Sequence, residues 1–358
     1  MSATKPTVLV TGSSGLIGRA TVERLARGYT VVGFDVQEPA PGAPLVFGKV
    51  DMTSDQSVST GLRRLLKRLG DRLAAVVHLA GHCDPLGGPS PLYSEVNVGG
   101  TMRLIRGLHE FQTAQFIFAS TMLVHAPCEP GERITEQSPI SPKWEYPEFM
   151  LRAEKLILAE RDDTPAVLLR VAGVYDGWCH SPPLARQIQG IYERHLTSHV
   201  YPADPVRGQA YVHVEDVAAA IEHAVERRVQ LPPESVVLIG EPETLGYGEL
   251  QDRFAKLIHH EEWDTYRVPK PLAKVGAWVK GHLPFAGEPL LKPRMIDRVD
   301  DHYELDISRA RRLLGWKPKH ALGDTLGDMV AALKADPIIW YGDNKLEEAA
   351  QPAGSRED

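Results

Sequence analysis

The chain has 358 residues but only three cysteines, Cys83, Cys128 and Cys179. Their number is odd, and neither a Cys-x-x-Cys spacing nor a paired histidine spacing accompanies them. This scarcity excludes a disulfide framework and a structural zinc site. We therefore predict that the protein holds no metal and resides in a reducing, cytoplasmic environment.

Basic residues are fewer than acidic ones, and the sequence has no long hydrophobic runs. Lys and Arg number 40 against 47 Asp and Glu, which gives a formal net charge of −7. Nothing in this balance favours a polyanionic partner. No stretch approaches the roughly 18 apolar residues of a membrane-spanning helix. We expect a protein that binds neither nucleic acid nor a membrane.

What the sequence does contain is a hydrophobic fraction of 43%, enough for a sizeable core. In the first half, short β-branched runs alternate with longer amphipathic stretches, which predicts a doubly wound α/β fold with a parallel sheet of six βα units. The expected strands are 7–11, 30–35, 45–50, 75–80, 115–120 and 166–174. The expected covering helices are 16–27, 58–69, 96–111 and 147–160.

Beyond about Tyr175 the connections become rich in proline, and amphipathic patterns predict helices at 184–195, 214–226, 247–259 and 322–333. We predict a dinucleotide-binding domain over 1–175, to which later elements could add, and a mainly substrate-binding region over 176–341. Residues 342–358 are polar and lack apolar periodicity, so we expect a disordered tail there.

A glycine-rich turn follows the first expected strand and opens the first helix. In Thr11–Gly18, Gly12 permits a tight turn, Gly15 lets backbone amides approach a pyrophosphate, and Gly18 allows the helix to pack closely on the strand. Leu16 and Ile17 begin the helix beside this site. The alternative is a βα turn that binds no ligand.

Acidic residues end the second and third expected strands. Asp35 is placed to accept hydrogen bonds from both hydroxyls of an adenosine ribose, and no Arg or Lys follows it to neutralise a 2′-phosphate, so NAD is favoured over NADP. Asp51 and Met52 are placed to meet the adenine. Asp51 could equally cap the next helix.

With these residues in place, the sequence over about 7–333 resembles the extended short-chain dehydrogenase/reductases, in their nucleotide-sugar epimerase/dehydratase branch. The resemblance implies a Rossmann fold that binds NAD. It rests on Thr11–Gly18, on 77–81 (VHLAG), 97–101 (NVGGT), 120–126 (STMLVHA), 170–175 (RVAGVY), 211–217 (YVHVEDV) and 305–316. By resemblance, Leu79, Ala80 and Gly81 line the cofactor, and Asn97 supports the active-site helix and lies by the cofactor.

The family uses a catalytic Tyr with a Lys four residues later. The segment 146–156 aligns without a gap and places Tyr146 on the catalytic Tyr but Met150 on the Lys. A register that uses Lys155 instead replaces the Tyr by Leu151, and Tyr146 and Lys155 cannot share one helix face. Without the lysine, Tyr146 should be a poorer base but still a proton donor. Arg152, Lys143 or a water could substitute.

Other site residues follow from the same resemblance. Thr121 matches the hydroxyl residue that bonds the substrate, although it could merely cap a turn. Arg207 and Arg298 are candidate substrate-binding residues, and Arg298 could instead be a surface residue paired with Asp301. Gly173 stands where the family has an Asn, which weakens the case for an ordinary nucleotide sugar.

We therefore expect an oxidoreductase of the NAD-dependent epimerase/dehydratase type, an isomerase or a lyase by outcome. It would act on a sugar-like small molecule, of which a nucleotide sugar is one form, by transient hydride transfer, and the resemblance implies a homodimer. One alternative is a simple NAD-dependent sugar or alcohol dehydrogenase. Another is an NAD-binding protein with a structural or sensing role, an idea that Met150 motivates.

Overall fold

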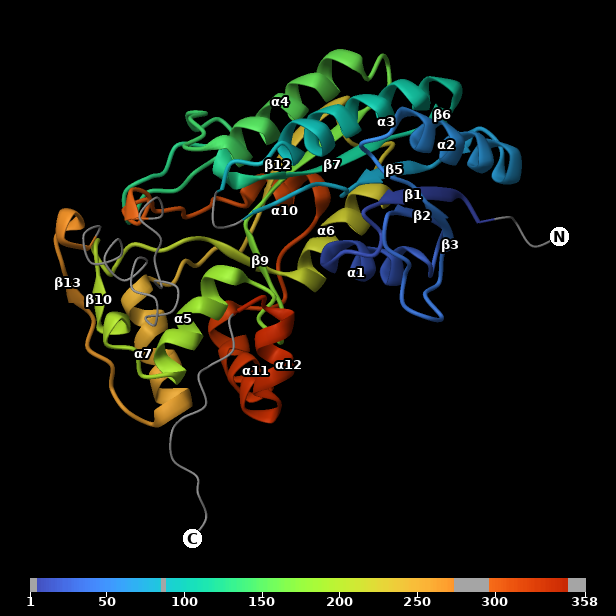
Figure 1. Ribbon diagram of the computed structural model, residues 1–358. Coiled ribbons are helices and arrows are strands. Elements are labelled where there is room, and N and C mark those ends of the chain that lie inside the picture. The colour runs from blue at the N-terminus through green and yellow to red at the C-terminus, as the bar shows by residue number, and fades with distance from the viewer. Residues whose placement is uncertain (1–4, 85–87, 274–295, 347–358) are drawn as a thin grey trace, which may run out of the picture.

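A seven-stranded parallel sheet forms the centre of the protein (Figure 1). The computed structural model describes residues 5–84, 88–273 and 296–346. The strand order is β12-β8-β7-β5-β1-β2-β3, and every pairing is parallel. The strands are β1 (Thr7–Thr11), β2 (Thr30–Asp35), β3 (Val46–Lys49), β5 (Ala75–His78), β7 (Phe116–Thr121), β8 (Ala166–Val171) and β12 (Glu234–Ile239). The predicted doubly wound fold is confirmed.

The seventh strand, β12, was not among the six expected ones. It follows Pro232 and Pro233 and pairs with β8 along its whole length, from Glu234 beside Ala166 to Ile239 beside Val171. Its Val236 to Ile239 run is as apolar as the other strands, but it lies in the proline-rich second half. The later part of the chain therefore completes the sheet.

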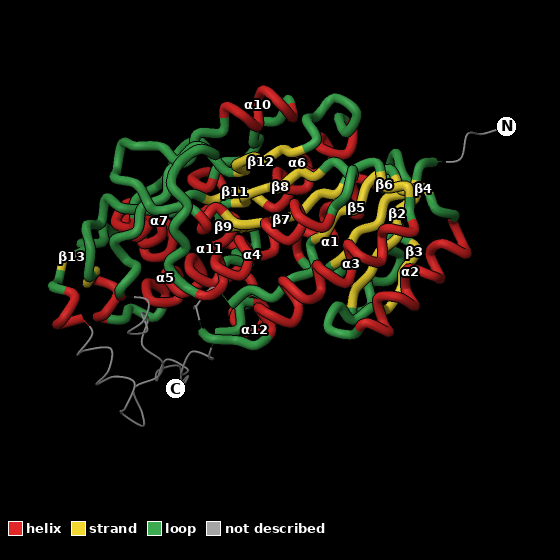
Figure 2. Tube along the Cα trace, turned by 90° about the horizontal axis from the view of Figure 1, so that it is seen from above, coloured by secondary structure: helices red, strands yellow, loops and turns green. Residues whose placement is uncertain are grey.

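Helices cover both faces of the sheet (Figure 2). On one face lie α1 (Leu16–Leu25), α6 (Val214–Glu226) and α10 (Ser308–Leu314), whose apolar side chains share one buried cluster with the sheet. On the other face, a second buried cluster joins the sheet to α2 (Asp55–Leu69), α3 (Thr101–Gly107) and α4 (Glu145–Glu160). This sandwich explains why the central strands are apolar on both sides.

The helix expected over 96–111 has three parts. It begins as the π-helix η1 (Tyr93–Gly100), continues as α3 and ends in the 3₁₀ turn η2 (Leu108–Glu110). π-Helical turns are uncommon and often occur at functional sites. Here the π-helix carries Asn97, a residue with poor helical propensity.

A third buried cluster is built from helices of the second half of the chain. Figure 1 shows them below the sheet, and they are α5 (Pro182–Tyr192), α7 (Tyr247–His259), α11 (Leu322–Ala335) and α12 (Pro337–Asp343). The same half of the chain also forms two small parallel strand pairs. They are β9 (Gly173–Tyr175) with β11 (Tyr211–His213), and β10 (Val200–Tyr201) with β13 (Tyr266–Arg267). The shorter elements are β4 (Arg72–Leu73), β6 (Gln112–Thr113), η3 (Met122–Val124) and η4 (Leu196–His199).

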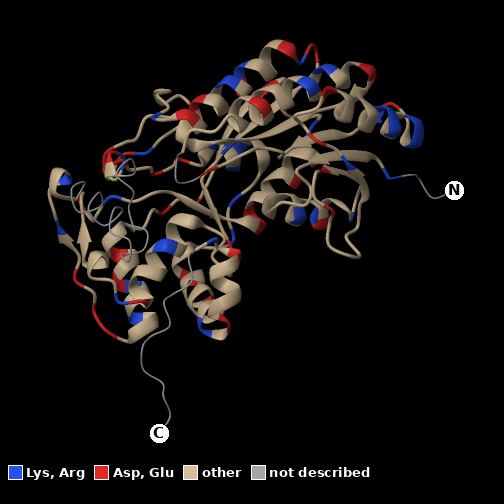
Figure 3. Ribbon diagram, viewed as in Figure 1, with Lys and Arg blue, Asp and Glu red and all other residues tan. Residues whose placement is uncertain are grey.

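Order continues past the point where we expected a disordered tail. Gly342 and Asp343 belong to α12, and Asn344 is buried, so the helical structure extends beyond residue 342. Residues 347–358 lie outside the described part of the chain. Within the described part, none of the helices combines the length and hydrophobicity that crossing a bilayer requires. In Figure 3, acidic and basic residues are intermingled along the helices that cover the sheet.

Candidate active site

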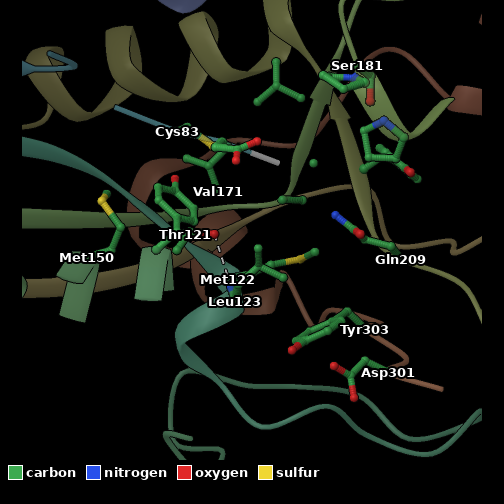
Figure 4. A pocket seen from close by; sticks show the side chains of 18 of the residues that line it. Cys83, Thr121, Met122, Leu123, Met150, Val171, Ser181, Gln209, Asp301 and Tyr303 are labelled. Atoms are coloured by element: carbon green, nitrogen blue, oxygen red, sulfur yellow. Dashed lines mark hydrogen bonds between the residues drawn. The ribbon is translucent and has the colours of Figure 1, made fainter. Parts of the chain in front are cut away.

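A pocket of about 530 Å³ opens where β5, β7 and β8 end. Ligands bind at the carboxyl ends of the strands in open parallel sheets. In Figure 4, Thr121 lies at one end of the pocket with Cys83 and Met150, and Asp301 and Tyr303 lie at the other. The lining also includes predicted site residues from several segments: Ile17, Leu79, Ala80, Gly81, Asn97, Tyr146, Arg207 and Arg298.

The glycine turn has the geometry that a bound pyrophosphate requires. Gly12 has φ +69°, and a Cβ there would lie 2.7 Å from the backbone nitrogen of Ala80. A Cβ on Gly18 would lie 2.0 Å from the carbonyl oxygen of Gly12. Gly15 begins α1 without a side-chain cap, and no acidic residue occupies the first turn. The free amides at this helix start suit an anion, so the turn fits the phosphates of NAD.

Asp35 lies next to this turn. Its two carboxylate oxygens accept the backbone N–H groups of Ser14 and Gln37, each at 2.9 Å. These bonds fix the carboxylate, and each oxygen keeps a lone pair for a ribose hydroxyl. The arrangement fits the adenosine ribose of NAD.

Asp51 does not cap the next helix, the alternative left open above, because the N-cap of α2 is Ser54. Its Oδ1 accepts the N–H and the hydroxyl of Thr53, both at 2.8 Å, in the turn that leads to Ser54, the N-cap of α2. Met52 is buried against Gly100. Contact of either residue with adenine stays a prediction.

The side chain of Asn97 hydrogen-bonds to the backbone of the segment that follows β5. Its Oδ1 accepts the N–H of His82 at 2.7 Å, and its Nδ2 donates to the carbonyl of His82 at 2.9 Å. The same Nδ2 lies 3.5 Å from Sδ of Met150 on α4. Asn97 therefore links η1, the segment after β5 and α4.

Tyr146 lies in the first turn of α4, and its hydroxyl lies close enough to Thr121 on β7 and to Cys83 for both to affect its pKa. Burial raises the pKa of the Tyr146 phenol well above its usual value, and the nearby Cys83 adds to the rise. Cys83 as a residue is exposed, but the protein atoms around its thiol raise the pKa of that group to about 11. Both groups are therefore protonated at neutral pH. The contact with Cys83 carries no sequence signal, because the two residues are 63 positions apart.

No lysine replaces the missing one among the described residues that line the pocket. Met150, at the position where the resemblance implies a lysine, is buried. Arg152 points elsewhere, because it pairs with Glu148 and stacks on Phe149 with 4.7 Å between the guanidinium carbon and the ring centre. Lys143 is exposed and does not line the pocket. Neither suggested substitute reaches Tyr146.

A buried ion pair connects α4 to the sheet close to Thr121. Glu154 and Arg170, with side chains 3% and 8% exposed, form two hydrogen bonds of 3.0 and 2.7 Å. Ser120 donates to Glu154, and Arg170 donates to Nε2 of His125 at 2.9 Å. Burial and the Arg170 charge lower the pKa of His125 to about 4, so this imidazole is neutral. The network fixes β7, β8 and α4 relative to one another.

The two candidate substrate arginines line the pocket but are engaged within the chain. Arg207 pairs with Glu129 and donates to the carbonyl of Asp300 at 2.9 Å. Arg298 lies over the ring of Trp144 at 4.1 Å, which is a cation–π contact. Their predicted contact with substrate stays a prediction.

The far side of the pocket is rich in aromatic and aliphatic groups. Tyr201 and Tyr247 stack with 3.8 Å between ring centres and 7° between planes. A Cβ on Gly173 would lie 2.8 Å from the Tyr211 ring and 3.0 Å from Nε2 of Gln209. These two side chains occupy the space of the asparagine that the family has there.

Comparison with known proteins places the chain in a family. A family described as the NAD dependent epimerase/dehydratase family matches residues 8–240. A 3-beta-hydroxysteroid dehydrogenase of Mycolicibacterium neoaurum is 25% identical, with 97% of this chain and 95% of that protein covered.

Solved structures share the fold. The UDP-glucuronic acid 4-epimerase of Bacillus cereus, in complex with UDP-glucuronic acid and NAD, has a TM-score of 0.70 at 21% identity, over 92% of this chain and 99% of that one. The dTDP-glucose 4,6-dehydratase of Bacillus anthracis, in complex with NAD, has a TM-score of 0.71 at 18% identity, over 94% and 99%. The family's description also confirms the expected cofactor class. The family match covers well over half of this chain, so the chain belongs to the NAD dependent epimerase/dehydratase family.

Proposed function

We propose that this protein is an NAD-dependent oxidoreductase that interconverts a secondary hydroxyl and a ketone on a ring-shaped substrate. The observation that carries the proposal is the convergence of Tyr146 and Thr121 at the carboxyl end of the sheet, in the pocket that reaches Ile17 beside the glycine turn. Bound NAD would accept or return the hydride. The chain supplies binding, orientation and proton transfer.

Tyr146 would exchange the proton of the reacting oxygen. In its ionised form it accepts the proton of the substrate hydroxyl, and in its neutral form it donates a proton to the ketone oxygen. The Thr121 hydroxyl, which lies near that of Tyr146, would orient the same substrate oxygen. The raised pKa of Tyr146 leaves the proton donor as the dominant form at neutral pH.

The pocket lining favours an apolar ring system on the substrate, such as a sterol-like alcohol. The stacked pair Tyr201 and Tyr247, together with Leu245 and Leu250, forms an apolar wall. Both candidate arginines already have partners within the chain. The steroid dehydrogenase of Mycolicibacterium neoaurum, which matches along nearly its full length, supports the same substrate class. A net dehydrogenase is the outcome that this class favours.

A second candidate is a nucleotide-sugar epimerase or dehydratase. One observation favours it: three guanidinium groups, those of Arg186, Arg207 and Arg298, line the same pocket. Guanidinium groups suit a diphosphate. In this case hydride is taken and returned within one turnover, so NADH does not accumulate.

Substrate trials with the purified full chain separate the two candidates. NAD is supplied with a 3-hydroxysteroid in one trial and with a UDP-hexose in another, while NADH absorbance and product composition are followed. NADH accumulation with the steroid supports the dehydrogenase. Conversion of the UDP-hexose without NADH accumulation supports the epimerase or dehydratase. If the wild-type chain converts neither substrate faster than the Tyr146→Phe variant does, the result favours an NAD-binding role over an enzymatic one.

A further inference from the structure

A buried chain of hydrogen bonds joins the glycine turn to the π-helix η1, and His78 is at its centre. His78 is the last residue of β5 and has no exposed surface. Its Nδ1 lies 2.6 Å from Oγ1 of Thr11, the residue before Gly12. Its Nε2 lies 2.8 Å from Oγ1 of Thr101. The Thr101 hydroxyl in turn donates to the backbone carbonyl of Asn97 at 2.6 Å.

The chain of bonds fixes the proton positions. The Asn97 carbonyl can only accept, so the Thr101 hydroxyl donates to it and accepts from Nε2–H of His78. A neutral imidazole with its proton on Nε2 accepts at Nδ1, so the Thr11 hydroxyl donates there. Thr11 Oγ1 in turn accepts the N–H of Ala80 at 3.2 Å. Each of these donors thus has an acceptor.

The surroundings of His78 hold it in this neutral form. The rings of Phe116 and Phe118 lie 5.9 and 5.7 Å from the imidazole, centre to centre. Complete burial lowers the pKa of His78 to about 3. The bonding pattern is therefore constant over the working pH range.

The two ends of this series of hydrogen bonds lie in the two halves of the candidate cofactor site. At one end, Thr11 precedes Gly12, which packs on the backbone of Leu79 and Ala80. At the other end, Asn97 holds the His82 backbone and contacts the sulfur of Met150. Because Met150 offers no ammonium for the nicotinamide ribose, the placement of the groups around Asn97 matters more here than where a lysine is present.

We propose that His78 is a positioning residue that couples the glycine turn to Asn97 and thereby holds the nicotinamide half of the NAD site in register with the pyrophosphate half. The inference rests on the proposed function, because it requires that the chain binds NAD. Its test uses binding alone and needs no substrate.

The decisive variant is Thr101→Val, which keeps the side-chain shape but removes the hydroxyl between His78 and Asn97. NADH fluorescence on binding reports the nicotinamide half, and calorimetric titration with ADP-ribose, which lacks nicotinamide, reports the rest. We expect Thr101→Val to weaken NADH binding about tenfold, the effect of leaving a buried partner unsatisfied, with ADP-ribose affinity unchanged. The matched control Thr101→Ser keeps the hydroxyl and should behave as the wild type.

His78 itself is tested with Leu and Gln. His78→Leu removes both bonds, so it should weaken NADH at least as much as Thr101→Val and should weaken ADP-ribose as well. His78→Gln retains one donor and one acceptor and should recover part of the NADH affinity. Leu326→Ala, a remote cavity variant in the third cluster, gives the effect of lost stability alone.

The outcomes are separable. Selective loss of NADH affinity in Thr101→Val, recovered in Thr101→Ser, supports the coupling. Equal losses for NADH and ADP-ribose that follow the melting temperature as in Leu326→Ala, or no loss at all, overturn it while the proposed function stands. If the wild-type chain binds neither ligand, the proposed function fails and the inference fails with it.

Discussion

The sulfur of Met150 lies 3.5 Å from the side-chain nitrogen of Asn97, so it receives an amide N–H where the family has a lysine ammonium. Lysine is a donor and carries charge, whereas methionine is a weak acceptor without charge. The contact joins α4 to η1, but no lysine is among the described residues that line the pocket with Tyr146. Several predictions depend on this exchange.

Restoring the lysine should accelerate the reaction. A cation within about 4–6 Å lowers a phenol pKa by roughly one to three units, so Met150→Lys should raise alcohol oxidation at neutral pH about tenfold or more. The measurement is kcat/KM for the substrate that the trials identify. Met150→Leu, which adds no charge, is the matched control and should stay at the wild-type rate. A lysine variant no faster than this control would favour the NAD-binding role.

Oxidation should also show an unusual pH dependence. The reactive form for oxidation is ionised Tyr146, and burial raises the pKa of this phenol above its usual value near 10. Oxidation should therefore rise about tenfold per pH unit with no plateau below about pH 10. Initial rates across alkaline pH check this. A plateau near neutrality would show that another group supplies the base.

Loss of the phenol should separate chemistry from binding. Tyr146→Phe removes the proton-transfer group, which contributes about 10²–10⁴-fold in comparable enzymes, so turnover should fall by that range. NADH affinity should change little, because the ring and its packing on Tyr93 remain. Parallel turnover and binding measurements test this, and unchanged turnover would remove Tyr146 from the mechanism.

Breaking the buried ion pair should cost far more than breaking an exposed one. Glu154→Gln leaves the Arg170 charge uncompensated, at an expected cost of about 3–5 kcal/mol in the free energy of unfolding. Glu148→Gln removes an exposed pair with Arg152 on the same helix and should cost less than about 0.5 kcal/mol. Urea unfolding of both variants gives the comparison. Similar losses would show that the buried network does not hold α4.

Sequence patterns predicted much of the fold and the candidate site. The glycine turn and Asp35 could be proposed from local patterns at the ends of strands, and Thr121 and Tyr146 from the family resemblance; their roles stay predictions. Strand β12 was missed because its short apolar run follows prolines in a loop-rich region. Local patterning cannot show that such a run completes a distant sheet.

Two other features were outside the reach of the sequence. One is the π-helical geometry of η1 around Asn97, a segment that contacts α4 through Met150. The contact between Cys83 and Tyr146 joins segments far apart in the chain. Both belong to tertiary structure, so neither leaves a periodic signal.

Cofactor choice tests the central claim most directly, namely that the glycine turn and Asp35 bind NAD although the lysine is missing. The measurement is a fluorescence titration of the purified full chain with NADH and, separately, with NADPH. The account predicts stoichiometric NADH binding and at least about tenfold weaker NADPH binding, because the Asp35 carboxylate repels a 2′-phosphate. Binding of neither dinucleotide, or a preference for NADPH, would contradict it.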